Sequence, residues 1–308
     1  MTTEFTTPLL IDACVGTTAA AALAQSQTST TEASRFMTID GGRIAYDDTG
    51  GDGRLILAIP GMGDLRSEYR MLRPALRRAG YRVVTMDLRG HGESSVRWKD
   101  YSAHAVGRDA LALIAHLNAD SAVILGTSFA AGSALWAAHD SPERVGGVVL
   151  LGPIVRDLDA SAIAKLALKI GFAGPWRVWF WTTYWSSLFP KHKPVDHEQA
   201  KAAIARSMRE PGRMDALQAM IALSKADTAA IISQSRVPAL VVMGTRDPDF
   251  PDASAEARWL ASQLHAETLI VEGAGHYPHT EMPEEVAPKL LSFIDGLRIE
   301  ESGKSSMT

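Results

Sequence analysis

Three things are scarce in this chain of 308 residues: cysteine, net positive charge and long apolar runs. The single cysteine, Cys14, excludes an internal disulfide and a metal cluster built on cysteine. A formal net charge of -4 and a pI near 6.1 give no overall basic field for nucleic acid, so we expect no nucleic-acid partner. No run is apolar for long enough to cross a bilayer, so we expect no stable insertion into a membrane.

The first 35 residues differ in composition from the rest, because they are rich in threonine, alanine and serine. Residues Leu9–Gln25 loosely resemble the apolar part of a secretory signal. No lysine or arginine precedes them, however, and Glu4 and Asp12 are acids that a signal peptide tolerates poorly. We therefore predict a flexible or loosely docked extension over residues 1–35 of a cytoplasmic protein, with export as the alternative. Residues 299–308 are polar and predict a flexible tail.

The rest of the chain has the composition of an enzyme with a sizeable core, with 46% hydrophobic and 21% charged residues overall. Alternating apolar and polar residues around Gly41-Gly42 predict a β-hairpin over residues 36–47. Nearly unbroken apolar runs, typical of parallel strands covered on both faces, follow at Leu55–Ile59, Tyr81–Met86, Ala122–Leu125 and Val145–Leu151. Segments with helical periodicity separate them, as in residues 101–117 and 129–138. Alternating strands and helices predict the α/β class with a doubly wound parallel sheet.

The alternation stops for about eighty residues and then resumes. Between residues 154 and 235 strand signals give way to helical stretches, divided by Gly174-Pro175, Pro190, Pro194 and Pro211-Gly212. Strands are predicted again at residues 239–244 and 268–272, and helices at residues 253–264 and 283–297. We therefore predict a core made of residues 36–153 and 236–298, interrupted by a helical cap of residues 154–235.

The strongest chemical signal is the segment Gly126-Thr127-Ser128-Phe129-Ala130, directly after a predicted strand and before a predicted helix. A nucleophile elbow needs small residues two places either side of its serine, because the flanking backbones nearly touch. Gly126 meets this need, and Ala130 stands where a second glycine is usual. The segment predicts Ser128 as a nucleophile at the carboxyl end of the sheet, where open α/β sheets bind ligands.

A serine needs a base, and the base needs a residue that orients it. His276 follows a late apolar run, and Asp247 follows the run before it. The order Ser, Asp, His is that of α/β hydrolases, so we predict His276 as the base and Asp247 as the orienting acid. Asp249 is the alternative acid, further from the strand end. His279 is the alternative base, but it lies beyond Pro278 and is expected to be a rim or solvent residue.

Four further segments complete a resemblance to a known family. Residues 57–64 resemble an oxyanion loop, residues 86–94 an Asp-x-x-Gly-x-Gly-x-Ser turn, residues 244–251 an acid loop and residues 275–283 a histidine loop. From about residue 36 to 297 the chain resembles the α/β-hydrolase superfamily, in the branch of lid-containing serine hydrolases. The resemblance implies a mostly parallel eight-stranded sheet with helices on both faces and a helical lid inserted after the sixth strand.

The resemblance also implies that the backbone N–H groups of Met62 and Phe129 form the oxyanion hole. Attack on an ester carbonyl puts charge on its oxygen, and losing one such donor costs about a hundredfold or more in rate. Phe129 follows the nucleophile at the start of a helix, where its N–H is free and the helix dipole assists. Pro60 stands where many relatives have histidine, and we expect adjusted packing there rather than lost activity.

One short stretch of the predicted cap is crowded with large apolar side chains, namely Trp176, Trp179, Phe180, Trp181, Tyr184, Trp185, Leu188 and Phe189. They lie nearly all round a helix, so one face cannot bury them all on the core. We expect Trp181, Tyr184 and Trp185 to line an apolar substrate pocket over Ser128. The alternative is an interfacial lid, since tryptophan and tyrosine favour membrane interfaces.

The leading hypothesis is a carboxylic ester hydrolase that works through an acyl-enzyme, with a small-molecule ester as its partner and no metal or organic cofactor. Serine at the elbow, rather than aspartate, disfavours the haloalkane dehalogenase and epoxide hydrolase branches. The alternatives are a carbon–carbon bond hydrolase, a lactonase or a cofactor-free perhydrolase on the same triad. A slow-turnover ligand sensor of the same fold is a further alternative, from a different functional class.

Overall fold

The structure is a computed structural model that describes residues 34–158 and 162–305. Within it, the chain from Ser34 onward forms one compact unit. The predicted extension, apart from its last two residues, lies outside the described residues, as does Cys14. No helix of the described part is both long and apolar enough to cross a membrane.

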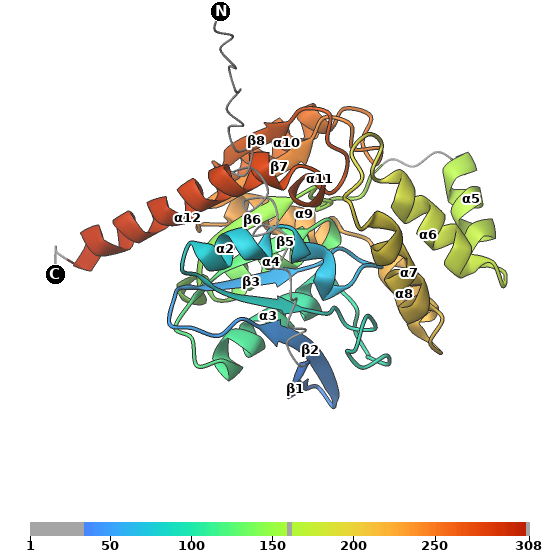
Figure 1. Cartoon of the computed structure of the whole chain (residues 1–308), viewed down its shortest axis with the longest axis horizontal. Coiled ribbons are helices and arrows are strands. Elements are labelled where there is room, and N and C mark those ends of the chain that lie inside the picture. The colour runs from blue at the N-terminus through green and yellow to red at the C-terminus, as the bar shows by residue number, and fades with distance from the viewer. Residues whose placement is uncertain (1–33, 159–161, 306–308) are drawn as a thin grey trace, which may run out of the picture. The chain divides into compact units, whose positions relative to one another are not determined.

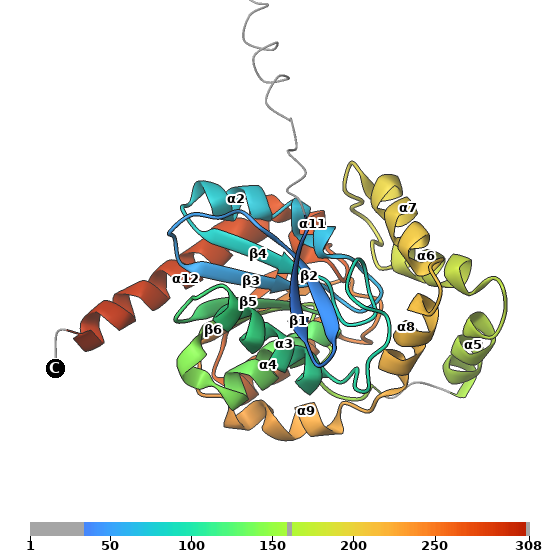
Figure 2. The ribbon, with the colours of Figure 1, turned by 90° about the horizontal axis from the view of Figure 1, so that it is seen from below.

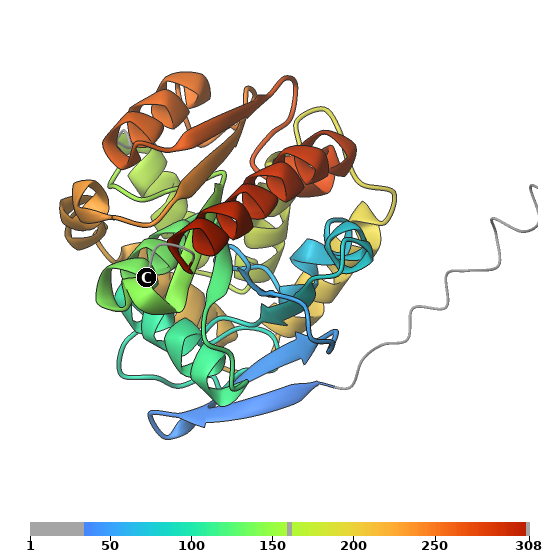
Figure 3. The ribbon, with the colours of Figure 1, turned by 90° about the vertical axis from the view of Figure 1, so that its left-hand side faces the viewer.

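An eight-stranded sheet organises the molecule, in the order β1-β2-β4-β3-β5-β6-β7-β8 (Figure 1). Its strands are β1 (Arg35–Ile39), β2 (Gly42–Asp48), β3 (Leu55–Ile59), β4 (Arg82–Met86), β5 (Ala122–Thr127), β6 (Val145–Leu151), β7 (Ala239–Gly244) and β8 (Glu267–Val271). Strands β1 and β2 form the predicted antiparallel hairpin, and β2 also pairs antiparallel with β4. All other pairs in the sheet are parallel. The hairpin lies at one edge of the sheet and β8 at the other (Figure 3).

Helices cover both faces of the sheet, as predicted (Figure 2). They are α2 (Arg73–Arg78), α3 (Ala103–His116), α4 (Phe129–Asp140), α10 (Ala253–Leu264), α11 (Pro278–Glu281) and α12 (Pro283–Ser305). One apolar core lies between the sheet and helices α3, α4 and α10, and the other between the sheet and α2 and α12. Strands β3, β5 and β7 are buried along their whole length, which explains their unbroken apolar sequences.

Side-chain caps start two of these helices. The Ser102 side chain accepts a hydrogen bond from the Ala105 amide, and the Asp252 side chain accepts one from the Ala255 amide. Helix α12 runs on to Ser305, although the sequence pattern predicted its end near residue 297. The added residues include Ile299, Glu300 and Glu301, which propensity alone allows in a helix.

The described chain between β6 and β7 is helical. It contains α5 (Ala162–Phe172), α6 (Arg177–Ser187), α7 (His197–Met208), α8 (Arg213–Ala222) and α9 (Ala226–Ile231). A third apolar cluster joins α6, α7 and α8 to Tyr277 of the core. Met62 packs against this cluster and also against the apolar core between the sheet and helices α3, α4 and α10. The helical segment is therefore seated on the carboxyl end of the sheet.

Candidate active site

Ser128 lies in a sharp turn between β5 and α4. Its backbone has a φ of 55° and a ψ of -120°, a conformation that few residues other than glycine adopt. Such a conformation costs about 1–3 kcal/mol and persists only where the surroundings enforce it. Here the Ser128 amide donates to the carbonyl of Leu151 at 2.9 Å, and its carbonyl accepts from Ala131 at 3.1 Å and Ile154 at 3.2 Å. These bonds fix the serine at the end of the central strands.

Close backbone contacts on both sides of Ser128 explain the small residues around it. A Cβ atom on Gly126 would lie 2.3 Å from the carbonyl oxygen of Ala130, which is backbone and cannot move aside. A Cβ atom on Gly61 would lie 3.3 Å from the Cβ atom of Ser128. The loop after β3 therefore passes directly beside the serine.

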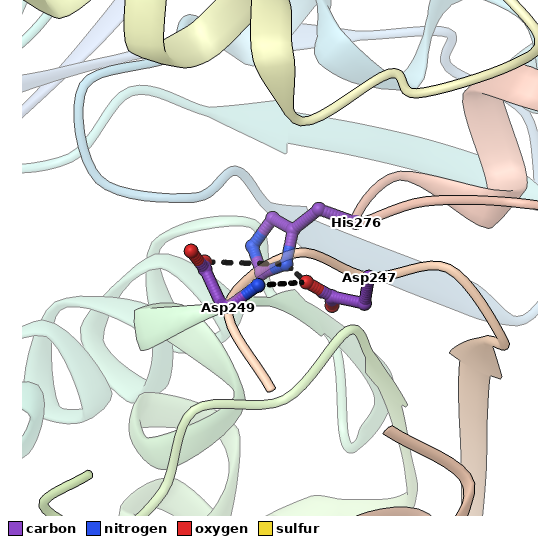
Figure 4. A group of neighbouring side chains, drawn as sticks. All are labelled: Asp247, Asp249 and His276. Carbon is purple, nitrogen blue, oxygen red and sulfur yellow. Dashed lines mark hydrogen bonds and ion pairs between the residues drawn. The ribbon is translucent and has the colours of Figure 1, made fainter. Parts of the chain in front are cut away.

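His276 and Asp247 meet at the same end of the sheet, on the loops after β8 and β7 (Figure 4). The Nδ1 atom of His276 lies 2.7 Å from Oδ2 of Asp247, and both side chains are buried. Asp249 is also near, with its Oδ2 atom 3.7 Å from the same nitrogen. The shorter contact belongs to Asp247, the residue that the sequence favoured over Asp249.

The backbone on either side of His276 is anchored by several contacts. Its amide donates to the carbonyl of Leu188 at 3.0 Å, and the carboxylate of Glu281 accepts from the amides of Gly275 and Tyr277. A Cβ atom on Gly152 would lie 2.4 Å from the carbonyl oxygen of His276. Gly152 directly follows Leu151, whose carbonyl accepts the hydrogen bond from the Ser128 amide. The histidine loop and the elbow therefore lie side by side at the carboxyl end of the sheet.

The electrostatic environment of His276 favours the imidazolium. Burial alone lowers the pKa of this histidine, but the carboxylates of Asp247, Asp249 and Glu68 outweigh burial and raise it to about 9. A base that takes a proton during a reaction becomes such a cation. The surrounding carboxylates therefore stabilise the form of His276 that proton transfer would create.

Comparison with known proteins identifies the family of this chain. The sequence profile described as alpha/beta hydrolase family matches residues 56–289. The chain belongs to this family.

Proteins similar to this hydrolase have names that refer to several reactions. A 3-oxoadipate enol-lactonase of Acinetobacter baylyi is 27% identical over 206 residues, which cover 66% of this chain and 75% of that protein. A putative non-heme chloroperoxidase of Synechocystis is 26% identical, over 82% of this chain and 94% of that protein. An esterase from Exiguobacterium antarcticum has a similar structure, with a TM-score of 0.74 at 18% identity, over 85% of this chain and 100% of that chain.

Two backbone amides of the hydrolase are free beside Ser128. In the loop after β3, the Gly61 amide donates to Oε2 of Glu68 at 2.8 Å and the Asp64 amide donates to the Gly61 carbonyl at 3.2 Å. The amides of Met62 and Phe129, predicted as the oxyanion hole, have no acceptor among the described residues. Phe129 is the first residue of α4, where helix geometry leaves an N–H group without an internal partner.

The three residues predicted to contact substrate each donate a hydrogen bond from α6 to the core. The Trp181 indole donates to the carbonyl of Gly63 at 3.0 Å, and the Trp185 indole donates to Oδ2 of Asp64 at 2.7 Å. The third is Tyr184, whose hydroxyl donates to a carboxylate of the acid loop, Asp249 Oδ1, at 2.6 Å. Their polar atoms therefore anchor α6 on the loops that carry the site.

The expectation that His279 is a rim or solvent residue is wrong. The side chain is fully buried, its Nε2 atom lies 2.9 Å from Oε1 of Glu68, and its ring packs against Tyr69 at 5.1 Å between centroids. Pro278 begins the short helix α11, which turns the next residue inward. The available sequence signal was Pro278 itself, because proline is common in the first turn of a helix and so indicates a helix start beside His279.

Sequence reasoning did not identify two buried acidic residues, one in the loop after β3 and one directly after that loop. Asp64 and Glu68 are both buried. Burial, together with the nearby charge of Glu68, raises the pKa of Asp64 to about 7. A buried acid four residues from another is not distinguishable in sequence from a pair on an exposed helix face.

The group of Asp247, Asp249 and His276 also has the spacing of a small metal site, since its ligand atoms lie within 4.8 Å of one another. Two of those atoms already share the hydrogen bond that orients the imidazole. A cation bound there would displace the proton on Nδ1. The hydrogen-bonded arrangement therefore favours an acid–base cluster over a metal centre.

Proposed function

We propose that this α/β hydrolase cleaves carboxylic esters through an acyl-enzyme on Ser128. The proposal is supported by the buried contact of 2.7 Å between Oδ2 of Asp247 and Nδ1 of His276. This contact lies at the carboxyl end of the sheet, as does Ser128. Holding Nδ1 in this way leaves Nε2 as the acceptor for a proton.

The reaction begins when the Ser128 oxygen attacks the ester carbonyl carbon while His276 takes the hydroxyl proton. The carbonyl oxygen becomes negative and accepts hydrogen bonds from the amides of Met62 and Phe129. His276 then gives its proton to the leaving alkoxide, which departs as the alcohol. Water, deprotonated by His276, attacks the acyl-enzyme, and the acid leaves as Ser128 regains its proton.

The substrate is proposed to be a small-molecule ester that is apolar near the bond cleaved. Aromatic side chains of α6 and Tyr277 form a cluster at this end of the sheet, with Met62 packed against it. Apolar walls with few polar groups are typical of small-molecule sites.

A lactone is the second candidate, favoured by the enol-lactonase among the relatives. A lactone is a cyclic ester, so the same steps apply, and the alcohol stays attached to the acyl group. The two substrates therefore differ in pocket shape and not in catalytic residues.

The test is hydrolysis of p-nitrophenyl esters, from acetate to palmitate, beside γ- and δ-lactones, by wild type and Ser128→Ala. We expect ester turnover that the substitution abolishes, with the preferred acyl length reporting the size of the pocket. Faster turnover of lactones would transfer the proposal to a lactonase. If neither class is cleaved, the ester proposal is wrong, and a carbon–carbon bond hydrolase, a perhydrolase or a sensor takes its place.

A further inference from the structure

The stretch from residue 160 to 195 is unlike the rest of the chain in charge. It contains no aspartate or glutamate, although the whole chain has 35 of them. Its five basic residues are Lys165, Lys169, Arg177, Lys191 and Lys193, and it holds four of the seven tryptophans, Trp176, Trp179, Trp181 and Trp185. Arg177 forms an ion pair with Asp215, so the excess positive charge of this segment comes from its lysines. A basic segment of this kind attracts groups of negative charge.

The tryptophans of α6, with Trp176 directly before it, point in two directions. Trp181 and Trp185 are buried against the core, whereas Trp176 and Trp179 are 49% and 67% exposed. The reason is geometric, because residues two apart in a helix point to nearly opposite sides. The exposed pair has no role in anchoring α6 on the catalytic loops.

The exposed tryptophans belong to a larger apolar surface. Four of the eight large apolar side chains that are exposed in the described part of the chain form two pairs about one helical turn apart: Leu166 with Ile170 on α5, and Trp176 with Trp179 at the start of α6. We call these four residues the outer cap face. The Trp176 indole donates to the carbonyl of Ile170 at 3.2 Å, which joins the α5 and α6 parts of this face. An apolar surface of this kind usually marks a site of interaction.

A basic groove lies next to the outer cap face, between α6 and α7. It has a volume of about 410 Å³ and is lined by Thr182, Glu198, Lys201, Ala202, Ala205, Arg206 and Arg209. The Thr182 hydroxyl donates to the carbonyl of Trp179 at 3.2 Å, so the groove begins one helical turn from an exposed tryptophan. Among the described residues, no carboxylate forms an ion pair with Lys201, Arg206 or Arg209.

We propose that the outer cap face docks on an anionic lipid surface. Trp176 and Trp179 would lie at the level of the headgroups, where tryptophan is favoured, with the apolar side chains of α5 beside them. Lys201, Arg206 and Arg209 would bind lipid phosphates, because basic residues near a membrane are attracted by its negative surface potential.

The charge of this region argues against a second copy of the chain as the occupant. A two-fold symmetric dimer places the same surface of both copies together, so the basic groove and the acid-free stretch would face one another. Like charges brought together in this way repel. A surface of phosphate groups has the complementary charge.

The test is sedimentation of the full chain with vesicles of phosphatidylcholine that contain phosphatidylglycerol, compared with phosphatidylcholine alone. We expect binding to the anionic vesicles only, weakened by added salt. Trp176→Ser with Trp179→Ser should remove most of the binding, and Arg206→Gln and Arg209→Gln should each weaken it about fivefold. Sedimentation measures binding and not turnover, so its outcome is independent of the ester proposal.

The matched controls are Phe36→Ser and Leu223→Ser, which remove apolar side chains that are 38% and 37% exposed elsewhere. They should bind vesicles like wild type, and thermal unfolding should show that all variants fold. Absence of vesicle binding by wild type would overturn the proposal, as would equal losses in the control variants. A dimer that the double tryptophan variant abolishes, with no vesicle binding, would assign the face to a second copy.

Discussion

The hydroxyl of Tyr184 lies 2.6 Å from Oδ1 of Asp249 and donates a hydrogen bond to it. The other oxygen of Asp249 lies 3.7 Å from Nδ1 of His276. Burial raises the pKa of Asp249, while His276 and the tyrosine hydrogen bond favour its ionised form. One carboxylate thereby connects α6 to the imidazole that we assign as the base.

The two aspartates near His276 should differ sharply when each is neutralised. Asp247→Asn should lower kcat by about 10⁴-fold, because an amide holds the imidazole in the wrong tautomer. Asp249→Asn should keep turnover within about tenfold at its own pH optimum, since the shorter contact to Nδ1 remains. Steady-state kinetics on one ester compares them. A larger loss in Asp249→Asn would make it the orienting acid.

Asp249 should instead set the pH at which the enzyme becomes active. The base must be neutral, so kcat/KM rises with pH as His276 loses its proton, near the raised pKa of about 9. Asp249→Asn removes a negative charge that stabilises the imidazolium, which lowers this pKa. The acidic limb of the pH–rate profile should therefore move to lower pH. An unchanged limb, or one moved upward, would show that Asp249 does not act on His276.

Tyr184→Phe should also move the acidic limb of the pH–rate profile to lower pH, but by less than Asp249→Asn does. Without the phenol, the ionised form of Asp249 loses a donor, so more of this carboxyl is protonated and less negative charge faces His276. The double variant with Asp249→Asn should then shift no further than Asp249→Asn alone. Trp181→Phe, which removes a different anchor of α6, is the matched control and should leave the limb in place. If the shifts of the two single variants add in the double variant, Tyr184 does not act on His276 through Asp249.

The Trp185–Asp64 hydrogen bond should contribute to stability in a pH-dependent way. Burial raises the pKa of Asp64 from 3.8 to about 7, so this carboxyl favours folding most at low pH, and its contribution is lost as pH rises to about 7. Trp185→Phe removes a donor to the ionised form. The free energy of unfolding should fall by about 1–3 kcal/mol more at about pH 8 than at about pH 5.

Urea denaturation at both pH values measures this difference. The smaller volume of phenylalanine lowers the free energy of unfolding by the same amount at each pH. The difference between the losses at the two pH values therefore reports the hydrogen bond. Trp179→Phe is the matched control, because that side chain is 67% exposed. A pH-independent loss in Trp185→Phe would contradict the assigned role of the hydrogen bond.

The sheet could be predicted from sequence because its strands are buried on both faces. β3, β6 and β7 begin and end at the predicted residues. An unbroken apolar run is typical of a strand that helices cover on both faces, so such a run indicates the bounds of the strand. The elbow was recognisable for a related reason, because Gly126 is required by a backbone contact within a few residues of it.

Contacts between distant segments left no local signal. His279 meets Glu68 across 211 positions, and Trp185 meets Asp64 across 121. The aromatic stretch predicted a crowded cap, but not which side chains turn inward, because that depends on how α6 is seated. Helix geometry places Trp179 and Trp181 on nearly opposite sides of α6, and the seating of α6 decides which of the two is buried.

The central claim is that Ser128 is the nucleophile, and covalent labelling tests it most directly. The protein should be incubated with a fluorophosphonate, which reacts with activated serines, and its intact mass and tryptic peptides then measured. We predict one adduct, on Ser128, that is absent in Ser128→Ala and greatly slowed in Asp247→Asn. Labelling of another residue, or equal labelling of wild type and Ser128→Ala, would contradict the account.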